Sequence, residues 1–175
     1  MSRTRRTFLG AAAAAAISGA AGCGGARGTT WRVFSGHEAR TLDALLEWII
    51  PEDDSPGARG AGVSHYIDRQ LSTHFREHRQ AYRDGLAATD RLAGGDFAGA
   101  PRKQQQAALR KLQRDPATRP FFNLLVPHAM QGFYGNPRHG GNRDFASWRM
   151  LGVPPLPVRG RSQYDLTAGG GNAKS

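Results

Sequence analysis

The sequence SGHEARTLDALLEWIIP, residues 35–51, indicates the fold of this chain more clearly than any other stretch. Ser35, followed three residues later by Glu38, is the capping-box pattern of a helix start. The apolar residues after it recur at the spacing of one helical face: Leu42, Leu45, Leu46, Ile49 and Ile50. Because Pro51 cannot continue a helix, we expect an amphipathic helix to end there.

The next part of the chain repeats this pattern of helix and loop. Residues 51–62 are a loop by composition. A second apolar stripe then extends to residue 92, and Gly85 marks an expected break within it. Gly94 and Gly95 stop the helix. The stripe consists of Val63, Ile67, Leu71, Phe75, Tyr82, Leu86 and Leu92.

Prolines mark the later helices. Pro101 suits the first turn of a helix with the sequence RKQQQAALRKLQR. Asp115 and Pro116 form an N-cap followed by proline, which predicts the start of another helix. Pro120 and Pro127 should start or kink that helix. Because no alternating strand pattern occurs, the sequence predicts an all-α, single-domain bundle of about four or five helices with long Gly/Pro loops.

The expected organisation has four parts. Residues 1–23 are a signal peptide, residues 24–34 a linker, residues 35–151 the helical domain and residues 152–175 an extended tail. The tail consists of Pro, Gly and polar residues, so we expect it to stay extended unless a partner holds it.

The N-terminus has the order of a bacterial export signal. The paired Arg5 and Arg6 precede Phe8 and Leu9, and an Ala-rich apolar run and small residues follow. The segment is too short and too rich in Ala for a membrane span. The paired arginines resemble a twin-arginine signal, which carries folded proteins that have often bound a cofactor or a partner. We therefore expect export to the periplasm through the Tat translocase.

Cys23 leaves two alternatives for the mature N-terminus. Residues 20–23 read Ala-Ala-Gly-Cys and resemble a lipoprotein processing box, in which Cys23 is lipidated and attaches the chain to a membrane. The alternative is ordinary cleavage near Ala21 or Ala26. Because Cys23 is the single cysteine, no intramolecular disulfide can form.

The charge of the chain is basic but mixed. After Cys23 the chain holds 21 of the 24 Lys and Arg residues and all 14 acidic residues, a net charge of +7. The basic residues are interspersed with acids and form no run of five, so we interpret them as a solvated surface. Export makes a nucleic-acid partner the least expected one, and we predict none.

His74 and His78 are the candidates for a metal site. Residues 74–78 read His-Phe-Arg-Glu-His, the inverted zinc-peptidase pattern, and on a helix the two histidines would share a face. Such a site needs a third ligand, a downstream glutamate, and Glu77 is the last glutamate of the chain. We therefore interpret both as boundary histidines and expect no metal, with a metal-dependent hydrolase as the alternative.

Motifs for cofactor binding and for covalent catalysis are missing. The chain has no Gly-x-Gly-x-x-Gly after a strand, no Cys-x-x-Cys-His and no nucleophile elbow. One cysteine cannot hold an iron–sulfur cluster. An export route suited to cofactor-loaded cargo is thus attached to a chain without an evident cofactor site. The signal most simply serves a second protein that is carried across with this one.

The most distinctive internal segment lies between residues 132 and 148. Residues 140–142, Gly-Gly-Asn, can adopt positive φ at successive positions. Aromatic and Arg side chains surround this turn and are typical interface anchors. The alternative is a turn packed under its own aromatics, and both can hold together. The expected partner interface is Phe133, Tyr134, Arg138, Gly140, Gly141, Asn142, Arg143 and Trp148.

A series of short residue blocks carries a resemblance to a known family, and the last block is the most specific. The blocks, in chain order, are Ile49-Ile50-Pro51, Asp53, Pro56-Gly57-Ala58, Ala61-Gly62-Val63, Tyr66-Ile67-Asp68, Leu71, Phe97, Gln104-Gln105, Phe121-Phe122, Gly132-Phe133-Tyr134, Gly140-Gly141-Asn142, Trp148 and Gly152-Val153-Pro154. Through these residues, most of the chain after Cys23 resembles the gluconate 2-dehydrogenase subunit 3 family, the small subunits of membrane-associated flavin dehydrogenases for sugars and sugar acids.

The resemblance implies a non-catalytic small subunit that carries the twin-arginine signal. Its partner would be an FAD-dependent flavoprotein of the glucose–methanol–choline type that lacks a signal, and a cytochrome with haem c often completes the complex. Cys23, Pro120 and Pro127 depart from the family pattern. The structural alternative is a free lipoprotein attached to a membrane through Cys23.

Overall fold

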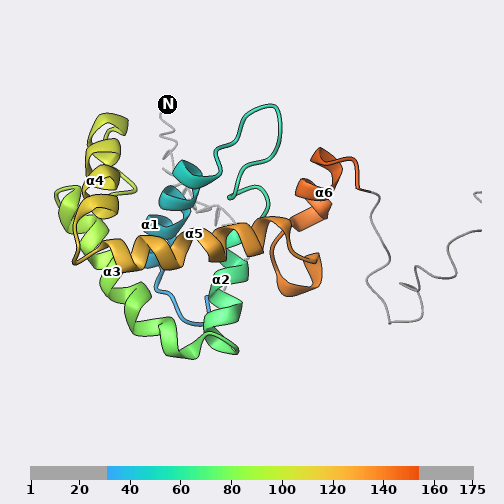
Figure 1. Cartoon of the computed structure of the whole chain (residues 1–175), viewed down its shortest axis with the longest axis horizontal. Coiled ribbons are helices and arrows are strands. Elements are labelled where there is room, and N and C mark those ends of the chain that lie inside the picture. The colour runs from blue at the N-terminus through green and yellow to red at the C-terminus, as the bar shows by residue number, and fades with distance from the viewer. Residues whose placement is uncertain (1–30, 154–175) are drawn as a thin grey trace, which may run out of the picture.

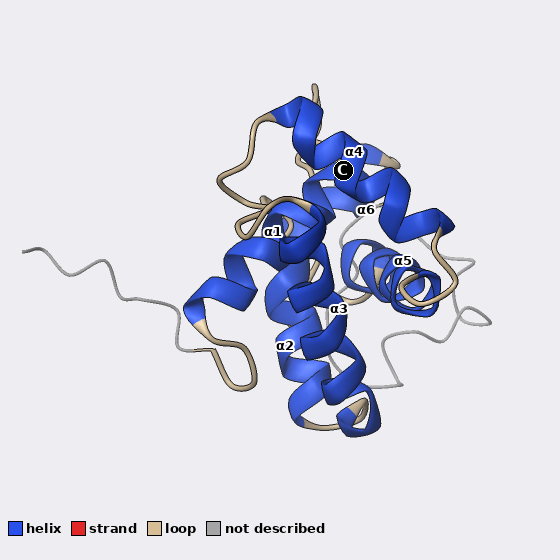
Figure 2. Cartoon of the chain, turned by 90° about the vertical axis from the view of Figure 1, so that its left-hand side faces the viewer, coloured by secondary structure: helices blue, strands red, loops and turns tan. Residues whose placement is uncertain are grey.

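The computed structural model describes residues 31–153, and this part of the chain consists of helices and loops without a strand (Figures 1 and 2). The prediction of an all-α fold is therefore confirmed. The elements in chain order are α1 (Gly36–Ile49), α2 (Val63–Ser72), the 3-10 turn η1 (Arg76–His78), α3 (Arg79–Leu92), α4 (Arg102–Arg114), α5 (Arg119–Tyr134), the 3-10 turns η2 (Pro137–His139) and η3 (Arg143–Phe145), and α6 (Ala146–Met150).

Helix α5 is the centre of the fold. It runs through the middle of the molecule in Figure 1 and contacts each of the other five helices. Its apolar residues meet those of its neighbours in one core. The largest fully buried side chains are Tyr82, Phe97, Phe133, Leu42, Leu45, Leu46, Ile67, Leu71, Leu86, Leu112, Leu125 and Val63.

Helix α1 begins and ends as its sequence predicts. The Glu38 N–H donates to Ser35 Oγ over 3.2 Å, and the Ser35 N–H donates to Glu38 Oε2 over 2.7 Å. This reciprocal pair satisfies two backbone donors at the helix start. The helix ends at Ile49, immediately before the Pro51 loop.

The stripe between residues 63 and 92 belongs to two helices, and the expected break at Gly85 is wrong. The chain turns between Ser72 and Arg79, whereas Gly85 lies inside α3. A Cβ at Gly85 would lie 2.1 Å from Cγ of Phe121. The glycine therefore lets the Phe121 ring of α5 pack directly on the backbone of α3.

The start of α5 also differs from the prediction. Asp115 does not cap this helix, because its Oδ1 accepts the Ala117 N–H over 2.8 Å in a preceding turn. Helix α5 begins at Arg119 with Pro120 in its first turn, and it continues past Pro127 to Tyr134. Proline is tolerated in a first turn because the N–H that it lacks would have no helical partner.

Two buried carboxylates tie distant segments together. Asp68 of α2 accepts the backbone N–H groups of residues 32–34, over 2.9–3.2 Å. Asp90 of α3 accepts hydrogen bonds from the Thr41 hydroxyl over 3.0 Å and from the Phe97 N–H over 3.0 Å.

Within residues 31–153, no helix is long and apolar enough to cross a membrane.

Candidate partner-binding surface

Residues 135–148, which connect α5 to α6 and include the first residues of α6, form a closed loop braced by one buried side chain. Asn142 Nδ2 donates to the Gly135 carbonyl over 2.9 Å, and Asn142 Oδ1 accepts the Ser147 N–H over 2.9 Å. One amide thereby joins the two ends of the loop. Trp148 Nε1 adds a third closure by donating to the Tyr134 carbonyl over 2.9 Å.

The loop lies directly against the backbone of α5. A Cβ at Gly141 would come 2.1 Å from the carbonyl oxygen of Gly132, so only glycine fits at this position. Gly140 has φ +102° and Asn142 has φ +44°. The predicted run of successive positive φ angles is therefore interrupted at Gly141, which makes the close contact instead.

Two further residues of the loop adopt the left-handed conformation. Asp144 has φ +54° and Phe145 has φ +57°. Left-handed backbone costs a residue with a side chain about 1–2 kcal/mol. The short polar side chain of an Asp can offset this cost by local hydrogen bonds, whereas a bulky aromatic side chain such as that of Phe145 cannot. Such conformations persist where the surroundings fix them, and they cluster at functional sites.

Contacts to α2 and to the 51–62 loop fix the outer side of the 135–148 loop. The Arg143 N–H donates to the Ala61 carbonyl over 2.9 Å, and the Arg143 guanidinium packs over Gly62. Arg69 of α2 donates to the Arg138 carbonyl over 2.7 Å.

Arg143 also affects the electrostatics of α2. Burial, and then the nearby Arg143, lower the pKa of His65 in α2 below its ordinary value.

An apolar cleft of about 230 Å³ lies beside this loop. Met130, Tyr134 and Met150 border it and are 37%, 44% and 44% exposed. Exposed apolar side chains that group together commonly mark an interaction surface. The complete lining is Ile49, Ile50, Pro51, Asp53, Ser55, Pro56, Met130, Phe133, Tyr134 and Met150.

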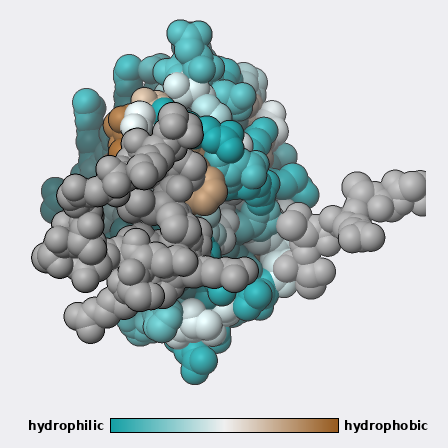
Figure 3. Space-filling model, turned by 90° about the vertical axis from the view of Figure 1, so that its right-hand side faces the viewer, coloured by the Kyte–Doolittle hydropathy of each residue, from teal (hydrophilic) through white to brown (hydrophobic). Residues whose placement is uncertain are grey.

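A second, more polar cleft of about 510 Å³ continues from the first, because both are lined by Ser55, Pro56 and Met150. Charged residues of both signs surround it. Its other lining residues are Glu52, Asp54, Gly60, Arg143, Asp144, Ala146 and Arg149. The two clefts together place a mainly apolar lining next to a charged one. Figure 3, which faces the α6 end of the molecule, shows apolar surface beside hydrophilic surface.

The predicted interface residues fall into two groups. Tyr134, Arg138 and Arg143 are exposed, and Gly140 and Trp148 are half-buried, so these five are available to a partner. In contrast, Phe133, Gly141 and Asn142 are buried and support the surface from beneath. Met130, Met150 and the acidic residues of the 51–62 loop were not among the predicted interface residues. Met130 lies in the apolar-rich stretch of residues 121–133, which was the available signal, whereas no local pattern marks Met150.

His74 and His78 do not share a helix face, so that expectation is wrong. His74 lies in the turn after α2, and His78 ends η1. Among residues 31–153, no three His, Cys, Asp or Glu side chains are placed to hold one metal ion.

His78 instead lies near a buried histidine of α5. The ring centroids of His78 and His128 are 5.7 Å apart. His128 stacks on Phe75 and pairs with the Tyr82 hydroxyl over 3.0 Å. Burial, and then the nearby His78, lower the pKa of His128, whereas burial raises the pKa of Tyr82.

The export motif and most of the tail lie outside the described residues. This holds for Arg5, Arg6, Phe8, Leu9 and Cys23, and for the chain beyond Val153.

Comparison with known proteins identifies the family. The model of the family described as gluconate 2-dehydrogenase subunit 3 matches residues 36–155. The match begins with α1 and extends past α6, so it includes both clefts and the 135–148 loop. No curated protein and no solved structure matches the chain. Because the family model covers more than half of the sequence, the chain belongs to the gluconate 2-dehydrogenase subunit 3 family.

Proposed function

We propose that this chain is the non-catalytic small subunit of a periplasmic, FAD-dependent sugar or sugar-acid dehydrogenase complex. It binds and stabilises a flavoprotein subunit of the glucose–methanol–choline type. The observation that carries the proposal is the family match over residues 36–155. FAD belongs to the partner, and haem c belongs to a cytochrome subunit where one is present.

The distribution of exposed apolar side chains supports a partner at the α6 end. The large apolar residues that are exposed in the described part all come from the last two helices and the chain just after them: Met130, Tyr134, Met150, Leu151 and Val153. Protein–protein interfaces combine an apolar core with polar residues around it, and the adjoining apolar and charged clefts offer both kinds of surface. The braced 135–148 loop would hold the anchors Tyr134 and Trp148 with little loss of conformational freedom on binding.

The export signal supports the same function. Arg5 and Arg6 provide a twin-arginine address on a chain that has no evident cofactor motif of its own. A flavoprotein that folds around FAD in the cytoplasm and lacks a signal could cross with this chain as one folded complex. The alternative of a metal-dependent hydrolase loses its geometric basis, since His74 and His78 lie on different local elements.

Co-purification with the flavoprotein tests the proposal. A tagged chain with Tyr134→Ser and Met150→Ser should retain at least tenfold less flavoprotein than the unchanged chain, because truncation of central anchors costs about 2 kcal/mol or more. The control is Ala87→Ser, at an exposed position of α3 away from both clefts. Equal recovery of FAD-containing protein by all three chains would refute the proposed interface, and no flavoprotein with any of them would refute the proposed function.

A further inference from the structure

Helix α4 and the turn after it concentrate positive charge. Residues 102–119 contain six basic residues and one acidic residue, Asp115. The basic residues are Arg102, Lys103, Arg110, Lys111, Arg114 and Arg119, and all are exposed. The mixed charge expected from the sequence is therefore uneven in three dimensions.

Three of these cations lie on one side of α4. The inner side of α4 packs against the core through Ala108, Leu109 and Leu112, so the opposite side must face solvent. On that side, Lys103, Arg110 and Arg114 follow each other at spacings of seven and four residues, which places them in one stripe along the helix. We call these three residues the cationic stripe.

Carboxylates within the described part do not neutralise the stripe. Among residues 31–153, the side-chain nitrogens that lie within 4.0 Å of a carboxylate oxygen belong to histidines, in the pairs His37–Asp90 and His78–Glu77. Arg102 is likewise exposed, but its guanidinium packs on the Trp48 ring, 3.8 Å from the ring centroid. Lys103, Arg110 and Arg114 are therefore exposed cations that pair with no carboxylate of the described part.

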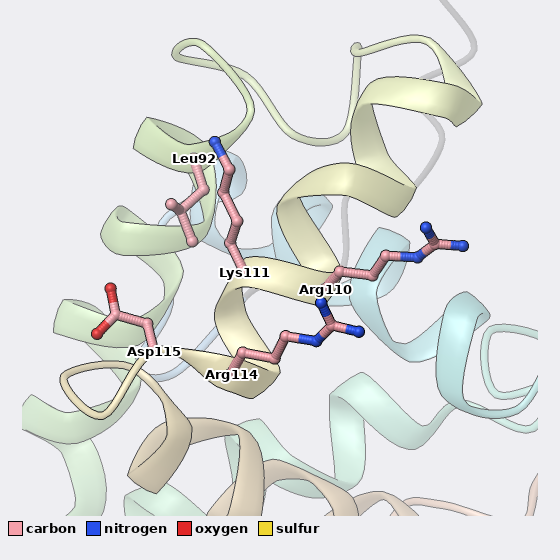
Figure 4. Close-up of a pocket in the computed structure, with 5 residues that line it drawn as sticks. All are labelled: Leu92, Arg110, Lys111, Arg114 and Asp115. Carbon is pink, nitrogen blue, oxygen red and sulfur yellow. The ribbon is translucent and has the colours of Figure 1, made fainter.

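Figure 4 shows how the side chains project. Arg110 and Arg114 extend from the same side of α4, and Lys111 extends beside Leu92 of α3. Together with Asp115 these residues line an open cleft of about 350 Å³. Three of the five lining residues are therefore cationic, one is acidic and one is apolar.

This surface lacks what a protein partner would need. The exposed large apolar residues of the described part lie at the α6 end, and Figure 1 shows α4 and α6 at opposite ends of the molecule. Protein interfaces depend on buried aromatic or apolar anchors. Adsorption to a plane of anionic headgroups needs only accessible Lys and Arg side chains.

We propose that the cationic stripe docks this chain on anionic phospholipid headgroups, without insertion into the hydrocarbon. The contact would be a second attachment to a membrane that does not need Cys23. Because it lies at the far end from the two clefts, it leaves the proposed flavoprotein surface free. The proposal rests on the charge and exposure of α4 and does not require the proposed function.

Vesicle co-sedimentation of the full chain tests this inference. All proteins carry Cys23→Ser, so that acylation cannot contribute. The test variant is Lys103→Gln, Arg110→Gln and Arg114→Gln. Its control is Arg32→Gln, Arg59→Gln and Arg83→Gln, which removes the same charge from exposed positions on other elements. Glutamine retains good helix propensity, and circular dichroism verifies that both variants fold.

Binding should depend on anionic lipid and on the stripe. We expect the chain and the control variant to bind vesicles of phosphatidylcholine with phosphatidylglycerol, and the stripe variant to bind about 100-fold more weakly, since each cation near the surface contributes roughly fivefold. Binding should fall with added salt. Equal weakening of both variants, or equal binding to pure phosphatidylcholine vesicles, would overturn the proposal. Binding to polyglutamate that depends on the stripe, without binding to anionic vesicles, would also overturn the proposal. That result would indicate an acidic protein as the partner of the stripe.

Discussion

Replacement of Asn142 by alanine tests whether the 135–148 loop is a braced support. The change removes the hydrogen bonds to the Gly135 carbonyl and from the Ser147 N–H. Each backbone group left without a partner costs about 1–3 kcal/mol when buried. Alanine at φ +44° adds about 1 kcal/mol, because it lacks the local hydrogen bonds that let asparagine adopt left-handed backbone. The expected loss of unfolding free energy is therefore about 3–7 kcal/mol.

Urea unfolding followed by far-UV circular dichroism measures this loss. Two further variants separate its causes. Asn142→Gly loses the same hydrogen bonds but relieves the backbone, so it should be about 1 kcal/mol more stable than Asn142→Ala. Asn142→Asp keeps an acceptor for the Ser147 N–H and should lie between the alanine variant and the unchanged chain. A free energy for Asn142→Ala within about 1 kcal/mol of the unchanged chain would refute the bracing role.

Four other outcomes follow from the sequence and the structure. Arg5→Lys combined with Arg6→Lys should block export of this chain and of its partner, and a double variant found fully in the periplasm on fractionation would contradict the signal. Replacement of His74 and His78 by Gln should leave the turnover of the assembled dehydrogenase nearly unchanged, which steady-state kinetics and metal analysis check together; loss of a stoichiometric metal with a large drop in turnover would show a metal site. Burial lowers the pKa of His128, so the unfolded state binds more protons and the unfolding free energy should fall as the pH drops below about 6.5; His128→Gln should flatten part of this dependence in urea titrations at several pH values. Trp148→Ala should weaken co-purification of the flavoprotein, whereas deletion of the residues after Tyr164 should not, and an unfolded Trp148→Ala chain would identify this indole as core.

Where the local sequence signals are unambiguous, they predicted the helices correctly. The Ser35 capping box and the leucines behind it specify α1, because both act within a few residues of the chain. The apolar stripe predicted the buried face of α2 and α3 but not the turn between them. Gly85 looked like a helix break by propensity, yet it is retained inside α3 because the Phe121 ring needs the space. That contact joins residues far apart in sequence, so no local pattern contains it.

The same limit applies to the candidate surface. Composition indicated a special loop near residues 140–142, and the structure shows glycine and asparagine in exceptional backbone positions there. Burial could not be predicted, since Phe133 and Tyr134 are neighbours of similar chemistry that face opposite environments. The clefts combine the 51–62 loop with α5 and α6, and only the tertiary fold brings them together.

Hydrogen exchange of the complex with its flavoprotein tests the central claim most directly. The chain is compared free and bound, with peptides that cover residues 31–153. We predict slower exchange on binding in residues 49–56 and 130–153, and unchanged exchange in the outward side of α4. Protection confined to α4 with no change around the two clefts, or no protection anywhere, would contradict the proposal that this surface binds the flavoprotein.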